Sequence, residues 1–143
     1  MKDIDIMADR KTDQPHEAAQ AGIAEWQRIV AELDWESLPD LLAEKVTYRS
    51  PADIEAYHGK DTMVAILRLV FGIMEDFTYL RHFSGGNGYV LEFSTHVGDA
   101  RLFGVDIVEF DQNGKITDFM VMMRPADAVL TLASEAAKRM AAG

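Results

Sequence analysis

The 143-residue sequence contains no cysteine, only 4 prolines and no long apolar run. Without cysteine there are no disulfide bonds and no thiol chemistry, so a domain of this size depends on its hydrophobic core. The longest apolar stretch, residues 64–74, is interrupted by Arg68 and is too short for a helix that spans a bilayer, which needs about 20 apolar residues. We therefore expect a cytoplasmic protein without a membrane partner.

Positive charge is also scarce in this chain. The 14 Lys and Arg residues stand against 24 Asp and Glu residues, which gives a formal net charge of −10. Such a surface repels phosphate backbones, so we expect no nucleic-acid partner, and we attribute the charge to solubility. No metal-ligand spacing connects the four histidines, and we expect neither a metal nor a cofactor: they are His16, His58, His82 and His96.

The first half of the chain has apolar residues at helical spacing. Residues 1–16 are polar and predict a flexible leader, followed by a single domain over residues 17–143. An amphipathic helix is predicted near residues 23–33. A short helix capped by Ser37 and a third, largely buried helix capped by Asp61 follow it.

The second half changes to the alternation typical of strands. After one strand over residues 46–50 and a loop over residues 51–60, four strands separated by turn signals are predicted between residues 77 and 124. Pro125 is well placed to begin a last helix. This order predicts an α+β fold in which helices pack on a curved sheet.

Asp106 is the one charge in the apolar segment 102–108. Burying a bare carboxylate costs several kcal/mol or more, so it must find a partner, hold a proton or face a wet cavity. We therefore take Asp106 as the first candidate for a functional residue. The alternative is a structural carboxylate that is satisfied by Tyr48, Trp26 or a backbone amide.

Four segments occur together in an order and spacing that are informative about family. They read LLAEKVTYRSP at 41–51, HGK at 58–60, GVD at 104–106 and NGKI at 113–116. Over about residues 18–125 this arrangement resembles the superfamily of nuclear transport factor 2, the SnoaL-like cyclases and ketosteroid isomerase. The resemblance implies a cystatin-like cone, in which a mixed, mostly antiparallel sheet wraps around helices and encloses an apolar pocket, and it implies a homodimer. Isomerases, dehydratases, cyclases, hydrolases and binding proteins share this fold, so it implies no single reaction.

The resemblance to ketosteroid isomerase extends to one functional position and fails at two. Asp106 falls where that enzyme keeps a protonated aspartic acid as a hydrogen-bond donor. At the position of the catalytic base, an Asp directly before a Pro, this chain has Ser50. The tyrosine that donates from the first helix is replaced by Trp26 or Ile29. The resemblance therefore implies the cavity of ketosteroid isomerase without its chemistry.

Strand alternation predicts which side chains face the pocket. If Asp106 points inward, Leu102 does too, and a tight turn at residues 98–99 would pair Leu102 with Thr95. The family alignment adds the inward positions of the last strand. The predicted ligand-binding residues are Trp26, Ser50, Phe93, Thr95, Leu102, Phe119, Val121 and Met123.

The opposite face of the same strands is apolar as well. It carries Phe103, Val105, Ile107, Met120 and Met122. A monomer seldom leaves such a contiguous patch in water, so we expect a homodimer through the outer face of the sheet.

Three functions remain open on this sequence. The first is a cofactor-independent enzyme that moves a proton on a small, apolar, oxygenated molecule, with Asp106 helped by His58 or Tyr48. The second is a binding protein that holds a small hydrophobic molecule in the pocket without chemistry. The third is a homodimeric interaction protein with a vestigial pocket.

Overall fold

The computed structural model describes residues 14–143, so residues 1–13 of the expected leader lie outside the described part. The last residues of that segment belong to the domain. Pro15 is buried, and the His16 side chain accepts a hydrogen bond from the Ala19 amide at 3.1 Å. The elements that follow are α1 (Glu17–Glu32), η2 (Trp35–Leu41), β1 (Leu42–Arg49), β2 (Tyr57–His58), α2 (Lys60–Phe71), β3 (Glu75–Gly85), β4 (Gly88–Val97), β5 (Ala100–Phe110), β6 (Ile116–Arg124) and α3 (Ala126–Ala142).

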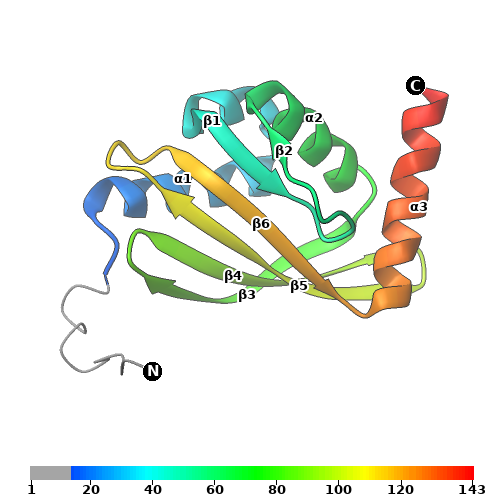
Figure 1. The fold of residues 1–143 in the computed structure, drawn as a ribbon. Coiled ribbons are helices and arrows are strands. Elements are labelled where there is room, and N and C mark those ends of the chain that lie inside the picture. Colours follow the sequence, from blue (N-terminus) through cyan, green and yellow to red (C-terminus); the bar gives the residue numbers. More distant parts are fainter. Residues whose placement is uncertain (1–13) are drawn as a thin grey trace, which may run out of the picture.

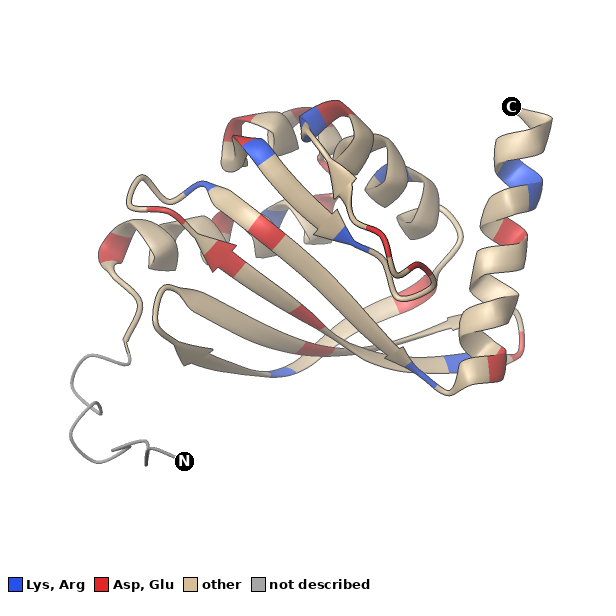
Figure 2. Ribbon diagram, viewed as in Figure 1, with Lys and Arg blue, Asp and Glu red and all other residues tan. Residues whose placement is uncertain are grey.

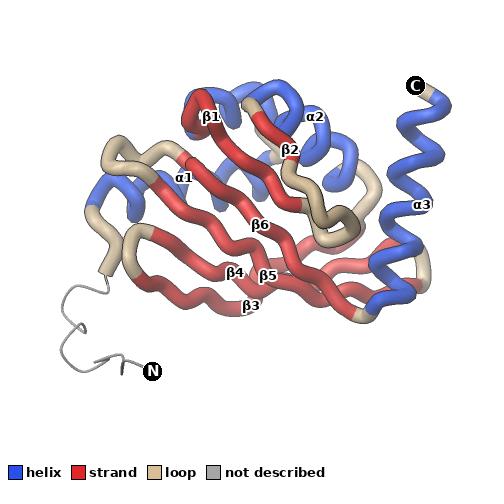
Figure 3. Tube along the Cα trace, viewed as in Figure 1, coloured by secondary structure: helices blue, strands red, loops and turns tan. Residues whose placement is uncertain are grey.

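The strands of the described part of the chain form one six-stranded sheet in the order β2-β1-β6-β5-β4-β3. Only β1 and β6 pair in parallel, and the other neighbours are antiparallel. The curved sheet carries α1 and α2 on one side, while α3 stands at one end of the molecule (Figures 1 and 3). The predicted α+β fold, with a curved and mostly antiparallel sheet around helices, is confirmed.

The register of the central strands follows the predicted alternation. Thr95 pairs with Leu102, and Leu91 pairs with Asp106. Leu102 and Asp106 are buried, whereas Phe103 between them is exposed. Because alternate side chains of a strand point to opposite faces, the inner surface of the cone is set by this register.

Two predicted helix caps are wrong. The short helix is a 3-10 helix that begins at Trp35, and Ser37 donates from Oγ to Asp34 Oδ2 at 2.6 Å instead of accepting from the backbone. The N-cap of α2 is Gly59, whose φ of +93° suits glycine, so Asp61 lies in the first turn. There it still faces the positive end of the helix.

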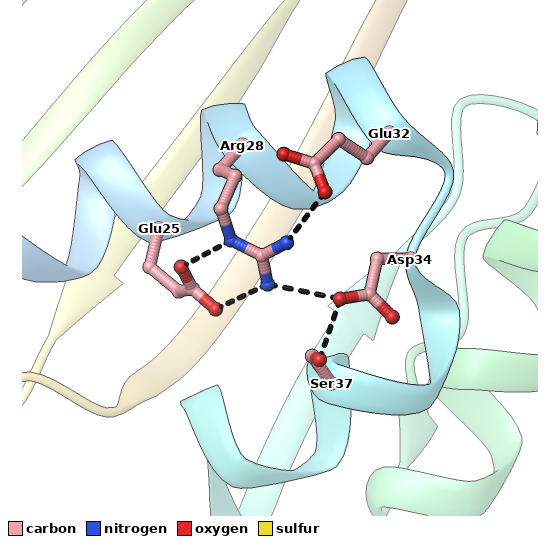
Figure 4. Close-up of polar contacts among 5 residues, drawn as sticks. All are labelled: Glu25, Arg28, Glu32, Asp34 and Ser37. Atoms are coloured by element: carbon pink, nitrogen blue, oxygen red, sulfur yellow. Dashed lines mark hydrogen bonds and ion pairs between the residues drawn. The ribbon is translucent and has the colours of Figure 1, made fainter.

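Arg28 connects the end of α1 to the start of η2 (Figure 4). Its guanidinium lies 2.8 Å from Glu25, 3.0 Å from Glu32 and 3.0 Å from Asp34. Hydrogen bonds from Ser37 and Arg28 lower the pKa of Asp34. Exposed pairs of this kind contribute little stability each, so the cluster mainly orients the turn between the two helices.

The contact between α1 and the sheet depends on two glycines. At Gly114, in the turn between β5 and β6, φ is +77°, and a Cβ atom would lie 2.5 Å from the Ala18 carbonyl oxygen. On the helix side, a Cβ at Gly22 would lie 2.5 Å from the Phe110 ring. The helix therefore rests directly on the sheet, which places its next turn, at Trp26, over the centre of the cone.

Both α2 and α3 leave much of their apolar surface unburied. In α2 only Met63 and Leu67 are fully buried, so the prediction of a largely buried helix is wrong. In α3 only Ala128 and Leu132 are fully buried, and Arg139 ties the far half to α2 by donating to the Gly72 carbonyl at 3.1 Å. None of the helices in residues 14–143 is both long and apolar enough to cross a membrane.

Candidate functional site

Asp106 is the innermost acid of the cone. Only 4% of the Asp106 surface is exposed to solvent. The Tyr79 hydroxyl of β3 donates to Asp106 Oδ2 at 2.6 Å, and Trp26 Nε1 of α1 donates to the same Tyr79 oxygen at 2.8 Å. None of the ion pairs within residues 14–143 involves Asp106. The acid therefore has a neutral partner and no compensating cation.

This environment changes how Asp106 titrates. Burial raises the pKa of Asp106 to about 7, and the hydrogen bond from Tyr79 opposes this shift. Burial and the nearby charge of Asp106 raise the pKa of Tyr79 well above its usual range, so Tyr79 remains a phenol that can donate. Near neutral pH, Asp106 is thus present in both protonation states, as a general acid or base requires.

Sequence reasoning missed Tyr79 as the partner of Asp106. Tyr79 pairs with Phe93 across β3 and β4, and Phe93 pairs with Gly104 across β4 and β5, which puts the tyrosine on the inner face. The available signal was the alternation of Phe77 and Tyr79 at the start of the predicted strand 77–83.

Most of the predicted ligand-binding residues form a packed interior. Trp26 is fully buried, with its ring centroid 4.8 Å from that of Phe119. The Phe93 ring fills the space over Gly104, where a Cβ atom would lie 2.6 Å from it. Thr95 donates to the Glu75 carbonyl at 2.7 Å. Also placed in the interior are Leu102 and Val121, which are buried, and Met123, which is half-buried.

A cavity of about 320 Å³ opens between α2, α3 and the connection from β1 to β2. We call it the α2–α3 pocket. Its polar lining residues are Tyr48, Ser50, Asp53 and Tyr57. Its apolar lining consists mainly of Ile66, Leu69, Val70, Val129, Leu132, Ala133, Ala136, Ala137 and Met140. A concave, mostly apolar site with a few polar groups is typical of small-molecule binding.

The polar groups at the rim are held together by Ser50. Its Oγ donates to Asp53 Oδ2 at 3.0 Å and accepts from the amides of Ala52 and Asp53, each at 3.2 Å. The Tyr57 hydroxyl donates to the same Asp53 oxygen at 2.8 Å, and this bond raises the pKa of Tyr57. Ser50 therefore orients a carboxylate that lies three residues further along the chain.

Tyr48 connects the buried acid with the pocket. It is 3% exposed and lines the α2–α3 pocket. Burial is the largest cause that raises the pKa of Tyr48, and the charges of Asp106 and Asp53 add to it. The strand pairing puts Tyr48 on the same face of the sheet as Asp106, because Tyr48 pairs with Phe119 of β6 and Asp106 pairs with Val121, two residues further along β6. Asp106 itself does not line the α2–α3 pocket, nor a second cavity of about 480 Å³ beside Tyr79.

The structure does not bring His58 to the α2–α3 pocket. In the short strand β2, Tyr57 pairs with Tyr48 and His58 pairs with Thr47, so Tyr57 and His58 face opposite sides. His58 is exposed and is absent from the pocket lining, where Tyr57 takes its place. Within residues 14–143, no three His, Asp or Glu side chains are placed to hold a metal ion.

Comparison with known families identifies this arrangement. The family described as the SnoaL-like domain matches residues 23–119, more than half of the chain. The chain belongs to the SnoaL-like family. The family and the fold implied by the sequence resemblance are thereby confirmed.

Solved structures extend the comparison for this SnoaL-like protein. A steroid delta-isomerase from Pseudomonas aeruginosa is 38% identical, with a TM-score of 0.86, over 90% of this chain and 95% of that one. A protein with a cystatin-like fold from Silicibacter pomeroyi is 32% identical, with a TM-score of 0.80, over 86% of this chain and 87% of that one. A nuclear transport factor 2-like protein from Mesorhizobium loti shares the fold at 17% identity, with a TM-score of 0.68, over 79% of this chain and 96% of that one. The search of curated proteins found no match.

Proposed function

We propose that this SnoaL-like protein binds a small, apolar, oxygen-bearing molecule in the α2–α3 pocket. We also propose that it acts on this molecule without a cofactor, as an isomerase, dehydratase or cyclase that uses Asp106. One observation carries the proposal: Tyr48 lines the pocket and shares the inner face of the sheet with the buried Asp106, whose charge raises the pKa of Tyr48. The apolar body of a ligand would lie between α2 and α3, with its oxygen toward Tyr48.

The chemistry follows from the protonation states of these two groups. A phenol whose pKa is raised stays protonated, so Tyr48 can donate a hydrogen bond to a ligand oxygen. Asp106, with a pKa of about 7, can supply or take up a proton near neutral pH. Donors in a site that excludes water stabilise negative charge that develops on such an oxygen.

The similarity to a steroid delta-isomerase supports an enzymatic role without defining the reaction. A double-bond shift needs a base that moves a proton between two carbons. Where ketosteroid isomerase keeps that base, this chain has Ser50, whose hydroxyl is engaged with Asp53. We therefore do not extend steroid isomerisation to this protein.

A second candidate is a binding protein without chemistry. It is favoured by the absence of Asp106 from the lining of the α2–α3 pocket. The substitution Asp106→Asn separates the two candidates once a ligand has been found by extraction from the purified protein. An enzyme loses turnover and keeps affinity, whereas a binding protein shows no turnover in either form.

The pocket itself can be tested by filling it. Ala136 lies on the pocket side of α3, and Ala136→Phe should weaken binding of the neutral dye Nile red about tenfold or more, because the added ring occupies the cavity. Dye fluorescence measures this binding. The control is Ser134→Phe, at an exposed position of α3 outside the pocket lining, which should bind the dye like the parent chain. Unchanged binding in Ala136→Phe would contradict a ligand site here.

The outer face of the sheet remains the proposed homodimer interface. Phe103 is 36% exposed and Met122 is 53% exposed, although both lie within the sheet. The apolar strip also includes Val105, Ile107 and Met120, and the pairs Arg81–Glu92 and Arg49–Asp118 lie beside it. A large apolar strip with a polar border is typical of a surface that is covered by a protein partner.

We expect the parent chain to sediment as a dimer and Met122→Glu to sediment as a monomer, because each copy would bury an unpaired charge. Analytical ultracentrifugation measures the mass directly. Leu130→Glu introduces the same charge at a 68% exposed position of α3 and should leave the dimer intact. A monomeric parent chain would remove both the interface and the interaction-protein hypothesis.

A further inference from the structure

Among residues 14–143, Asp53 is the only charged side chain that lines the α2–α3 pocket. Its two hydrogen bonds to other side chains come from the neutral hydroxyls of Ser50 and Tyr57, and both reach Oδ2. Among the contacts of residues 14–143, no ion pair involves Asp53, and Oδ1 accepts no hydrogen bond. The rim of the pocket thus carries a negative charge that the surrounding side chains orient and leave uncompensated.

Two aromatic rings accompany this carboxylate. The centroids of Tyr48 and Tyr57 are 6.4 Å apart, and both rings line the pocket. The hydrogen bond to Asp53 raises the pKa of Tyr57, so its ring stays a neutral phenol. A carboxylate beside aromatic rings is suited to an ammonium group, since the rings attract cations electrostatically and the carboxylate adds a full charge.

The local charge pattern favours a cation over an anion. The loop over residues 50–56 contains Asp53 and Glu55 and has no Lys or Arg, as Figure 2 shows. Of the basic residues on the neighbouring elements, Arg49 pairs with Asp118, Lys60 with Glu44 and Arg139 with Glu135. Neither Arg68 of α2 nor Lys138 of α3 lines the pocket. An acidic ligand would meet the uncompensated Asp53, and the net charge of −10 would repel it further.

We propose that the α2–α3 pocket selects apolar molecules that carry an ammonium group, with Asp53 as the charged partner of that group. The apolar body lies along the α2 and α3 side chains, and the ammonium group lies at the rim beside Tyr48 and Tyr57. This proposal rests on the proposed function, because it names the class of ligand for the same pocket. It assigns selectivity to Asp53 and general affinity to the apolar walls.

Three probes with the same ten-carbon chain test this selectivity: decyltrimethylammonium, 1-decanol and decanoate. Each is titrated below its aggregation concentration, at low salt and pH 7.5, and followed by amide chemical shifts in NMR spectra. The ammonium probe should bind about tenfold more tightly than decanol, and decanoate should bind most weakly. Asp53→Asn should abolish the preference while decanol binding stays unchanged. Glu55→Gln removes a charge from the same loop outside the pocket lining and should preserve the preference.

The outcomes separate this proposal from the function on which it rests. If decanol binds and Ala136→Phe abolishes its binding, the pocket is a ligand site. An ammonium probe that then binds no tighter than decanol, or that keeps its preference in Asp53→Asn, overturns the selectivity alone. Ammonium binding that survives in Ala136→Phe reports attraction to the acidic surface and also overturns it. If no probe binds the parent chain, the pocket function and the selectivity both fail.

Discussion

Asp106→Asn is expected to unfold less readily than the parent chain at alkaline pH and to lose much of the pH dependence of stability. Burial raises the pKa of Asp106 from 3.8 to about 7. Between these values the folded protein holds a proton that the unfolded chain has released, so the free energy of unfolding falls as pH rises. The contribution of protonated Asp106 to the free energy of unfolding is fully present below about pH 4 and is lost as pH rises through about 7.

The size of this effect follows from the shift in pKa. A tenfold change in an acid constant corresponds to about 1.4 kcal/mol, so the parent chain should lose up to about 4 kcal/mol that the variant retains. An Asn side chain can still accept the hydrogen bond from Tyr79 and does not ionise. Urea unfolding at pH 4, 6 and 8 measures the free energy for both proteins.

A second group acts in the same direction and must be separated from Asp106. Hydrogen bonds to Asp76 and to the Gly98 carbonyl raise the pKa of His96, so its stabilising effect is also lost as pH rises through that raised pKa. The difference between the parent chain and Asp106→Asn cancels this contribution. Asp99→Asn, at an exposed turn, should show the pH dependence of the parent chain. If the free energy of unfolding changed with pH in the same way in the parent chain and in Asp106→Asn, Asp106 would ionise in the folded protein without loss of stability, which would contradict the prediction.

Trp26→Ala is expected to destabilise the domain strongly. Trp26 is fully buried, and its ring packs against those of Phe119 and Trp35 at centroid distances of 4.8 and 6.4 Å. Removing a buried tryptophan costs about 3–5 kcal/mol, and a domain of this kind has roughly 5–15 kcal/mol in total. The substitution also removes the indole donor to Tyr79, the residue that holds Asp106.

Trp26→Phe separates the packing from the hydrogen bond. It keeps an aromatic ring in the core and removes the Nε1–H donor, so we expect a folded protein that loses clearly less stability than Trp26→Ala. Circular dichroism during thermal unfolding measures both losses. Equal stability of the two variants would show that the packing of the interior does not depend on the volume of this ring. It would then favour the original expectation of a deep cavity beneath α1.

The sequence was informative about Asp106 because strand alternation is a local property. An acid in the middle of the apolar segment 102–108 had to share a face with Leu102, and the observed pairing of Leu102 with Thr95 agrees. Its partner Tyr79 was harder to find. The pairing of β3 with β4 changes register from Tyr79 to Arg81, and no local sequence pattern predicts such a bulge.

The pocket could not be placed in the same way. The family resemblance put it inside the cone, but Trp26, Phe93 and Phe119 fill that space, and the described cavity opens between α2 and α3. Its apolar wall needs the position of α3 relative to α2, which depends on packing between segments about 60 residues apart. Asp53 lies in a loop without periodicity, so only its contacts with Ser50 and Tyr57 distinguish it.

The sequence by itself determined the family, the order of helices and strands, and the inward direction of Asp106. These features follow from spacing along the chain and from the local preferences of each residue. Only the tertiary structure decided the partner of Asp106, the location of the pocket and the exposure of Asp53 at its rim. Those features depend on how distant segments dock, because a side chain's burial, charge environment and neighbours are set by groups far away in the sequence.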